Sequence, residues 1–502
     1  MLSAELEGPV DHIVSRPPVV VAVAVVFLLS TALFAADAPP SESGQGRPGL
    51  RVYREVLDDP YIPVPISELV TSPAGEWGAN GHVSVQVNVA ANGDNIVGDA
   101  ANEPSIAVDP TDASHIAIGW RQFDTVASNF RQAGRAFSTD GGATWTFAGV
   151  IEPGVFRSDP VLDSSAEGDF YYDSLAEDLI CWVHSSADHG ATWGTGVYGY
   201  GSDKQWLTID RTGGLGHGNL YQNWSPFTAA TFNRSVDGGA SFQTPVAVPL
   251  EPWWGTSTVG HDGAVYFAGL ASPVSSVSVA RSSNAQDPSA AVSFDQSVVV
   301  DLGGEPQGWG GPNPGGLLGQ VWVATDHSGG PTNGYVYVLA SVDPAGADPL
   351  DVRFSRSTDG GATWSTAVRV NDDPVGSNAY QWFGTMSVAP DGRIDVIWND
   401  TRNDPGGYDS ELTYAYSLDG GSTWSANEML SPAFDPHLGW PQQDKIGDYY
   451  DMVSDETGVH IAYAATFNGE QDVYYLHLDP PVMFADDFES GTTDAWSVVV
   501  TD

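Results

Sequence analysis

The phrase Ser138-Thr139-Asp140-Gly141-Gly142-Ala143-Thr144-Trp145 decides the fold, because the chain repeats it. Four further versions keep the pattern Ser-x-Asp-x-Gly-x-x-aromatic, at residues 186–193, 235–242, 357–364 and 417–424. Serine and aspartate oxygens can close a tight turn on backbone N–H groups, glycine can take a positive φ, and the aromatic ring can pack beneath the turn. Each copy therefore predicts a β-hairpin turn.

The spacing of the copies predicts the unit to which each hairpin belongs. Asp140, Asp188 and Asp237 are 48 and 49 residues apart, and the later copies of this aspartate are Asp359 and Asp419. A period of this length indicates one supersecondary unit per repeat, and a four-stranded propeller blade fits it. The chain is therefore expected to be an all-β protein, a β-propeller of four-stranded blades.

The number of blades follows from the apolar runs between the copies. Six inner strands after a first one at residues 105–108 give seven blades, and six blades are the alternative if the Gly-rich fifth unit is an insertion. Residues 82–90 place valine at every second position, as strands do, and this strand is expected to complete the last blade and close the ring. The expected starts of the later inner strands are Asp159, Gln205, Trp254, Gly319, Gln381 and Asp448.

The charge balance of the chain argues against an anionic partner. The 502 residues include 64 acidic and 18 basic side chains, for a net charge of −46, which repels phosphate backbones and anionic membrane surfaces. We therefore expect no nucleic acid among its partners. Cys181 is the only cysteine, so no intrachain disulfide is possible, and its apolar neighbours predict a buried thiol.

The chain is expected to contain four parts. Residues 1–38 include an apolar run that predicts an export signal or an uncleaved anchor. Residues 39–81 form a linker and Pro-rich lead-in, residues 82–479 the propeller, and residues 480–502 a short tail. We therefore expect an extracellular or cell-surface monomer, with membrane contact only through the N-terminal segment if it is uncleaved.

The repeated phrase resembles the Asp-box (BNR) repeat of the sialidase superfamily, and the resemblance covers residues from about 103 to 424. It implies a β-propeller in which the Asp boxes are structural turns on the face away from the active site. It also implies a secreted glycoside hydrolase of exo-α-sialidase type, acting on terminal acidic sugars. In that family three arginines hold the substrate carboxylate, a tyrosine paired with a glutamate is the nucleophile, and an aspartate is the acid/base, an exception among glycosidases.

The residues that the resemblance implies for a site come from one face of the propeller. On that face the inner strands begin, and the loops between second and third strands lie beside them. We expect it to present polar and aromatic side chains suited to a sugar, among them Glu103, Asp159, Lys204, Gln205, Trp224 and Asp400. The implied arginine cluster is Arg121, Arg157 and Arg402. Arg157 lies in Phe156-Arg-Ser-Asp-Pro160, which is similar to the family's Phe-Arg-Ile-Pro motif. It differs from that motif by one additional residue and by its position after the first Asp box. The implied catalytic residues are Tyr449 (or Tyr450), Asp448 and Glu411, with Trp206, Trp382 and Gln381 as sugar contacts.

Two further expectations concern ions and the alternative function. No cofactor is required, and a structural calcium ion is an option in the oxygen-rich loops at residues 371–373, Asp400, Asp404 and Asp409. The alternative to a hydrolase is a non-catalytic Asp-box propeller that binds glycans or proteins at the cell surface.

Overall fold

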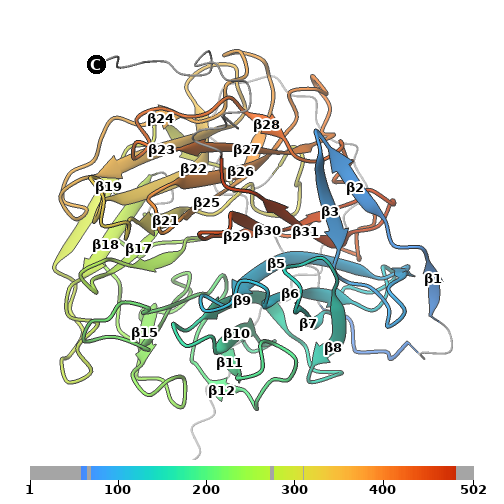
Figure 1. Cartoon of the computed structure of the whole chain (residues 1–502), viewed down its shortest axis with the longest axis horizontal. Coiled ribbons are helices and arrows are strands. Elements are labelled where there is room, and N and C mark those ends of the chain that lie inside the picture. The colour runs from blue at the N-terminus through green and yellow to red at the C-terminus, as the bar shows by residue number, and fades with distance from the viewer. Residues whose placement is uncertain (1–57, 65–68, 272–275, 309, 482–502) are drawn as a thin grey trace, which may run out of the picture. The chain divides into compact units, whose positions relative to one another are not determined.

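The computed structural model describes residues 58–64, 69–271, 276–308 and 310–481, and every regular element in them is a strand. The export segment predicted over residues 1–38 lies outside the described residues, as does almost all of the predicted tail. In the described part of the chain there is no helix with the length and apolar character needed to cross a bilayer. Figure 1 shows the strands arranged as blades around a central axis.

Blades 1 to 3 follow one another from residue 100. Blade 1 consists of β5 (Ala100–Val108), β6 (Ile116–Phe123), β7 (Gln132–Ser138) and β8 (Thr146–Ile151). Blade 2 consists of β9 (Ser158–Ser164), β10 (Phe170–Leu175), β11 (Cys181–Ser186) and β12 (Val197–Tyr198). Blade 3 consists of β13 (Trp206–Ile209), β14 (Leu220–Asn223) and β15 (Phe232–Ser235). An isolated bridge between Phe232 and Val246 takes the fourth position of blade 3.

Blades 4 to 6 continue the ring. Blade 4 consists of β16 (Ser257–Val259), β17 (Val265–Leu270), β18 (Val277–Ser282) and β19 (Gln296–Val300). Blade 5 consists of β21 (Trp322–Thr325), β22 (Val336–Pro344), β23 (Asp351–Ser357) and β24 (Val368–Arg369), with β20 (Gly304–Pro306) pairing along the extension of β22. Blade 6 consists of β25 (Gln381–Val388), β26 (Ile394–Asp400), β27 (Glu411–Ser417) and β28 (Glu428–Met429). The Gly-rich fifth unit is therefore a blade, and seven is the correct count.

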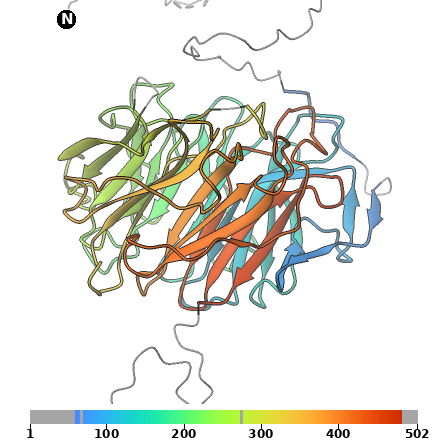
Figure 2. The ribbon, with the colours of Figure 1, turned by 90° about the horizontal axis from the view of Figure 1, so that it is seen from above.

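Blade 7 joins the two ends of the described chain. It consists of β29 (Asp451–Ser454), β30 (Val459–Ala465) and β31 (Asp472–Leu478), to which β3 (His82–Gln86) and β2 (Glu76–Ala79) are added. Ser84 pairs with Leu476 and Gln86 with Tyr474, both antiparallel. The prediction that this N-terminal strand closes the ring is confirmed, and Figure 2 shows it alongside the last blade.

Two details differ from the sequence-based expectation. The six later inner strands begin within three residues of the predicted starts, whereas the first begins at Ala100, five residues before the predicted Ser105. The lead-in predicted over residues 39–81 contains two short strands. One is β2, and the other is β1 (Val70–Ser72), which pairs with β4 (Asn95–Val97).

The repeated phrase forms the same hydrogen-bonded turn at all five positions. At residues 138–145, the Ser138 hydroxyl donates to Asp140 Oδ1 at 2.8 Å and accepts from the Gly142 N–H at 2.9 Å. The Asp140 carboxylate also accepts from the backbone and hydroxyl of Thr144, at 2.9 and 2.6 Å. The same four bonds recur in the turns that start at Ser186, Ser235, Ser357 and Ser417. We call these five segments the repeated turns, and the face that carries them the turn face.

The second glycine of each repeated turn also serves blade packing. A β-carbon at Gly142 of blade 1 would lie 2.0 Å from the Tyr475 ring of blade 7, and one at Gly421 of blade 6 would lie 2.1 Å from the Phe354 ring of blade 5. Both glycines have positive φ. The glycine is therefore needed both for the turn conformation and for close approach to the preceding blade.

The repeated turns supply a stability prediction. Hydrogen bonds, above all from the Thr363 hydroxyl, lower the pKa of the Asp359 carboxyl to about 2. We expect Asp359→Ala to lower the free energy of unfolding by about 1–3 kcal/mol, because the turn loses its acceptors. Urea unfolding of the variant measures this. Ligand binding should not change, and a loss of binding at unaltered stability would contradict a purely structural role.

Candidate functional site

Each blade has one residue with a positive φ just before or within the first part of its inner strand. Five of them carry side chains: Glu103, Asp159, Lys204, Trp254 and Phe383, with φ between 49° and 59°. Gly319 and Gly447 take the same place in blades 5 and 7. Strand pairing is irregular beside Glu103, Asp159 and Phe383, as expected of a bulge. Such strained positions gather at functional sites, where they aim side chains.

Charged side chains from these starts form a buried cluster near the axis. Lys204 Nζ lies 2.8 Å from Asp159 Oδ2 and 2.8 Å from Asp448 Oδ2. Lys445 Nζ lies 2.8 Å from the same Asp448 oxygen, and Arg121 Nε lies 3.2 Å from Glu103 Oε2. All six side chains are at most 8% exposed. We call Glu103, Arg121, Asp159, Lys204, Lys445 and Asp448 the axial ion cluster.

Burial and charge act in opposite directions on the acids of this cluster. Burial raises the pKa of the Glu103 carboxyl above its usual range, although Arg121 and Lys204 oppose the shift. Burial acts in the same direction on Asp159 and Asp448, but the Lys204 ammonium and its basic neighbours outweigh it, so their pKa values lie below the usual range. Burial therefore favours the neutral acid at Glu103, whereas the basic neighbours favour the carboxylates of Asp159 and Asp448.

Two loops pack over the cluster at the ends of the strands. Asn313 Nδ2 donates to the Gly447 carbonyl at 2.8 Å, and the Leu317 N–H donates to Asp448 Oδ1 at 2.7 Å. Gln443 Oε1 accepts from Arg121 Nη2 at 3.1 Å. The sequence predicted that the face where the inner strands begin would present polar and aromatic side chains. In the structure most of these side chains are buried.

The structure brings three of the predicted site residues together. Arg121 and Asp448 belong to the axial ion cluster, and Tyr449 lies against it. The Tyr449 hydroxyl donates to the Pro160 carbonyl at 2.7 Å, and the side chain is 1% exposed. Burial, with a further contribution from Glu103, raises the pKa of this phenol well above its usual value. Tyr449 is thus held as a neutral donor in this conformation.

Trp206 packs against Tyr449 and is described with the cavity below, whereas the other predicted residues have partners elsewhere. Arg402 pairs with Asp400 at 2.8 Å and with Asp372 at 2.6 Å. Gln381 Nε2 donates to the same Asp400 at 3.2 Å. Arg402 and Gln381 thus share a network within and beside blade 6, away from the partners of Arg121 described above.

Arg157, Glu411 and Trp382 also have structural partners. Arg157 pairs with Glu152 and lies 5.6 Å from the Trp182 ring centroid. Glu411 accepts a hydrogen bond from Asn403. Trp382 is fully buried, and its indole N–H donates to Ser410 Oγ at 3.0 Å. The arginine cluster and the Tyr–Glu pair implied by the resemblance stay predictions, and the partners described here serve packing.

The loops considered for calcium already contain donors to their carboxylates. Asp373 Oδ1 accepts from Asn371 and lies 2.8 Å from Arg369 Nη2. The Asp404 carboxylate accepts from the Asp409 N–H at 3.1 Å. Calcium at these loops stays a prediction.

A cavity of about 480 Å³ runs along the axis, enclosed by the inner strands of all seven blades. It extends from Trp206, two residues after Lys204, to the loops that follow the inner strands on the turn face. The end of the cavity nearest Lys204 is aromatic: the Trp206 ring meets Trp322 at 5.0 Å and Tyr449 at 5.8 Å between centroids, both edge to face. Trp206 is therefore the one predicted sugar contact that lines this cavity.

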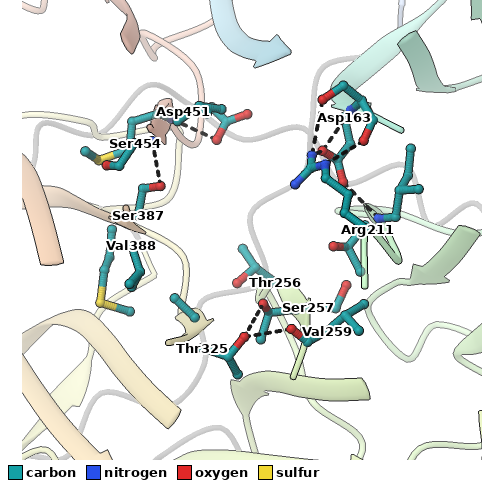
Figure 3. A pocket seen from close by; sticks show the side chains of 18 of the residues that line it. Asp163, Arg211, Thr256, Ser257, Val259, Thr325, Ser387, Val388, Asp451 and Ser454 are labelled. Atoms are coloured by element: carbon teal, nitrogen blue, oxygen red, sulfur yellow. Dashed lines mark hydrogen bonds and ion pairs between the residues drawn. The ribbon is translucent and has the colours of Figure 1, made fainter. Parts of the chain in front are cut away.

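The walls of the cavity combine apolar and polar side chains, and many of the polar groups are already engaged (Figure 3). Side chains of one inner strand accept backbone N–H groups of the next inner strand, although these strands do not pair in a sheet. Five such bonds of 2.8 to 3.1 Å join Leu162 to Ser105, Ile209 to Asp163, Val323 to Thr256, Ser454 to Ser387, and Ile106 to Asp451. These bonds hold the inner strands together around the axis and leave fewer groups for a ligand.

Ser257 and Arg211 are candidate polar contacts for a ligand on this wall. Ser257 Oγ is buried and has no hydrogen-bond partner among the described residues, and the same holds for Ser454 Oγ. The Arg211 side chain pairs with Asp163 and stays 42% exposed. Figure 3 shows Arg211 and Ser257 on different parts of the wall.

Sequence reasoning missed part of this arrangement. It placed Glu103, Asp159 and Lys204 at the starts of inner strands and expected them on a sugar-binding face, not in a buried ion cluster, and it did not name Lys445 or Arg211. One signal was available: acidic residues stand directly before proline in Glu103-Pro104 and Asp159-Pro160, at matching places in two blades.

Comparisons with known proteins do not assign this chain to a family. The sequence matches no known family model and no curated protein. Similar solved structures include a protein of unknown function from Dyadobacter fermentans, with 15% identity, 79% of this chain and 97% of that chain covered, and a TM-score of 0.44.

Two glycosidases are also among the similar structures. One is the α-L-arabinofuranosidase Arb93A from Fusarium graminearum, with 13% identity, 79% and 97% coverage of the two chains, and a TM-score of 0.42. The other is the sialidase from Trypanosoma rangeli, with 14% identity, 80% and 60% coverage, and a TM-score of 0.39. At these identities and TM-scores the similarities carry no functional argument, and the seven-bladed fold rests on the strand pairing of this chain.

Proposed function

We propose that this protein binds a carbohydrate in its axial cavity, with access from the turn face. The observation that carries the proposal is the cavity of about 480 Å³ with Trp206 and Trp322 at the end nearest Lys204. Small-molecule sites have volumes of roughly 300–1,000 Å³ and combine apolar walls with a few placed polar groups. Sugars suit such a site because their C–H faces pack on aromatic rings while their hydroxyls need hydrogen bonds.

The polar groups of the wall favour a neutral or singly anionic sugar. Ser257 Oγ can donate to and accept from a hydroxyl, and Arg211 can donate to a hydroxyl or a carboxylate. Among the described residues, Arg211 is the one arginine that lines the cavity, and the chain has a net charge of −46, so a highly charged anionic ligand is disfavoured.

Binding without catalysis is supported better than hydrolysis. A retaining glycosidase of the ordinary type needs two carboxyl groups about 5–5.5 Å apart that are free to act on the sugar. In the cavity, Asp163 is engaged by Ile209 and Arg211, Asp451 by Ser105 and Ile106, and Asp455 by Thr457 and His460. These bonds assign all three carboxyl groups to the structure of the ring.

Sialidase-type hydrolysis is the second candidate, on one specific observation. Tyr449 lies beside the axial ion cluster, which contains an acid of raised pKa, Glu103, and an arginine, Arg121. A tyrosine nucleophile with a glutamate base is the chemistry that the sequence resemblance implies. Access to it would require the loops around Asn313 and Gln443 to open.

The test measures binding and turnover on the same protein. Isothermal titration with galactose, arabinose and 3′-sialyllactose is expected to detect saturable binding of at least one of these sugars. Ser257→Ala should weaken that binding about three- to tenfold, because one hydrogen bond is lost. Ser297→Ala is the matched control, since its hydroxyl is also without a described partner but lies on β19, outside the cavity lining.

Two outcomes would overturn the proposal. One is the absence of saturable binding of all three sugars, and the other is equal weakening by the two serine variants. Release of 4-methylumbelliferone from a fluorogenic sialoside, lost in Tyr449→Phe, would favour the hydrolase instead.

The cellular setting is part of the same proposal. An extracellular or cell-surface location, a glycoconjugate partner and a monomeric state are consistent with carbohydrate binding and with the acidic composition. Cell fractionation of the full chain tests the location.

A further inference from the structure

One of the five repeated turns departs from the others at a single position. After the aspartate, four turns carry a glycine with φ between 66° and 70°: Gly141, Gly238, Gly360 and Gly420. The turn at residues 186–193 carries His189 there, with φ of 56°. A side chain in this left-handed conformation is strained relative to glycine. The turn thus carries an imidazole where the backbone geometry favours no side chain.

The His189 side chain meets two residues of the neighbouring blade. Its ring stacks on His115 with 4.0 Å between centroids and 16° between planes. Its Nδ1 atom lies 3.1 Å from Asp109 Oδ2. Asp109 follows the inner strand of blade 1 and His115 precedes the second strand, so blade 1 supplies two of the three groups. One ligand atom from each residue lies within 4.8 Å of the others.

The atoms that face one another here are left without hydrogen bonds. His115 Nδ1 and His189 Nδ1 are buried and have no hydrogen-bond partner among the described residues. Asp109 Oδ1 accepts from the backbone and hydroxyl of Thr111 at 2.8 and 2.7 Å, which fixes the carboxylate and leaves Oδ2 toward His189. Two ligands bound about 2.0 Å from a tetrahedral zinc ion lie about 3.3 Å apart. The 3.1 Å separation without hydrogen-bond geometry fits two ligands of one ion.

We propose that Asp109, His115 and His189 bind a divalent transition-metal ion of the zinc type, which links blades 1 and 2 on the turn face. Two imidazole nitrogens and one carboxylate oxygen suit zinc, whereas calcium and magnesium prefer all-oxygen sites. The side chains of His115 and His189 are 24% and 37% exposed, so an ion can enter from solvent. The fourth ligand is either a water molecule or Asp112, whose Oδ2 atom lies 3.4 Å from His115 Nδ1.

The experiment uses the untagged full chain, stripped with EDTA and dialysed. Titration with ZnCl₂ in the presence of millimolar calcium is expected to show one saturable site, and zinc should raise the melting temperature. Calcium occupies weak sites on the acidic surface and should not compete with nitrogen ligands. His189→Gly restores the glycine of the other four turns, so it should fold at least as well without zinc. It should weaken zinc binding by at least about tenfold and abolish the zinc-dependent rise in melting temperature.

His82→Gln is the matched control. His82 pairs with Glu428 at 2.9 Å and is 24% exposed, but it lies on blade 7. Its loss should leave zinc binding unchanged. The proposal is overturned if the natural chain shows no saturable zinc site, or if His189→Gly binds zinc as tightly as His82→Gln does. In either case the three residues form only a histidine–carboxylate contact.

Discussion

Replacement of Lys204 by methionine is expected to lower the free energy of unfolding by about 3–5 kcal/mol. Its ammonium lies 2.8 Å from both Asp159 and Asp448, and all three side chains are buried. Methionine keeps the length of the chain but removes the charge. Two buried carboxylates then lose a common partner, and an uncompensated buried charge is far more costly than an exposed one. Urea unfolding followed by tryptophan fluorescence measures the effect.

Lys445→Met is the control within the same cluster. Lys445 contacts Asp448 at 2.8 Å, but that carboxylate would keep Lys204. The loss of stability should therefore be smaller than for Lys204→Met. If Lys204→Met proves as stable as the natural chain, the axial ion cluster does not hold charged carboxylates as described.

Stability is expected to fall as the pH rises from about 4 to about 8. Burial raises the pKa of Asp173 to about 7 and that of Asp451 to about 7, from a usual value of 3.8. The folded chain therefore binds protons that the unfolded chain has already released. This contribution is complete below the unfolded pKa and is lost as the pH passes the folded pKa. At about 1.4 kcal/mol per pH unit, the loss is on the order of a few kcal/mol for each carboxyl group.

Urea midpoints at pH 5, 6, 7 and 8 test this dependence. Asp173→Asn should flatten it, because Asp173 Oδ1 has no described hydrogen-bond partner and the amide resembles the protonated acid. Asp287→Asn is the control: hydrogen bonds from Ser289 lower the pKa of its exposed carboxyl, so it stays ionised throughout this range. Stability that rises between pH 5 and 8 would contradict the assignment.

Most of the fold could be predicted from local chemistry. The hydrogen bonds of the repeated turns join residues at most four positions apart, such as Ser138 and Gly142. The sequence pattern therefore predicts them directly. The alternating valines at residues 82–90 likewise predicted the closing strand. The short strands β1 and β2 were missed because strands of three or four residues have too few positions to show an alternation.

The site was harder to predict, since it depends on contacts between distant blades. Arg402 was predicted beside Arg121 from loop position alone, yet Asp372 and Asp400 hold its guanidinium. Whether a start of an inner strand is exposed depends on the loops that cover it, and nothing near Lys204 in sequence indicates the loop at Asn313. The metal ligands were missed because His189 becomes unusual only when its φ and its neighbour His115 are known.

The pairing of β3 with β31 limits when the ring can close during synthesis on the ribosome. Ser84 leaves the ribosome well before its partner Leu476, which lies 392 residues later in the chain. Until Leu476 emerges, β3 can pair only with β2, and blade 1 has no blade 7 to pack against. An unpaired strand edge that persists through synthesis invites pairing with other chains. Completion of the ring therefore waits for the synthesis of β31, and a chain cut short before β31 cannot reach it.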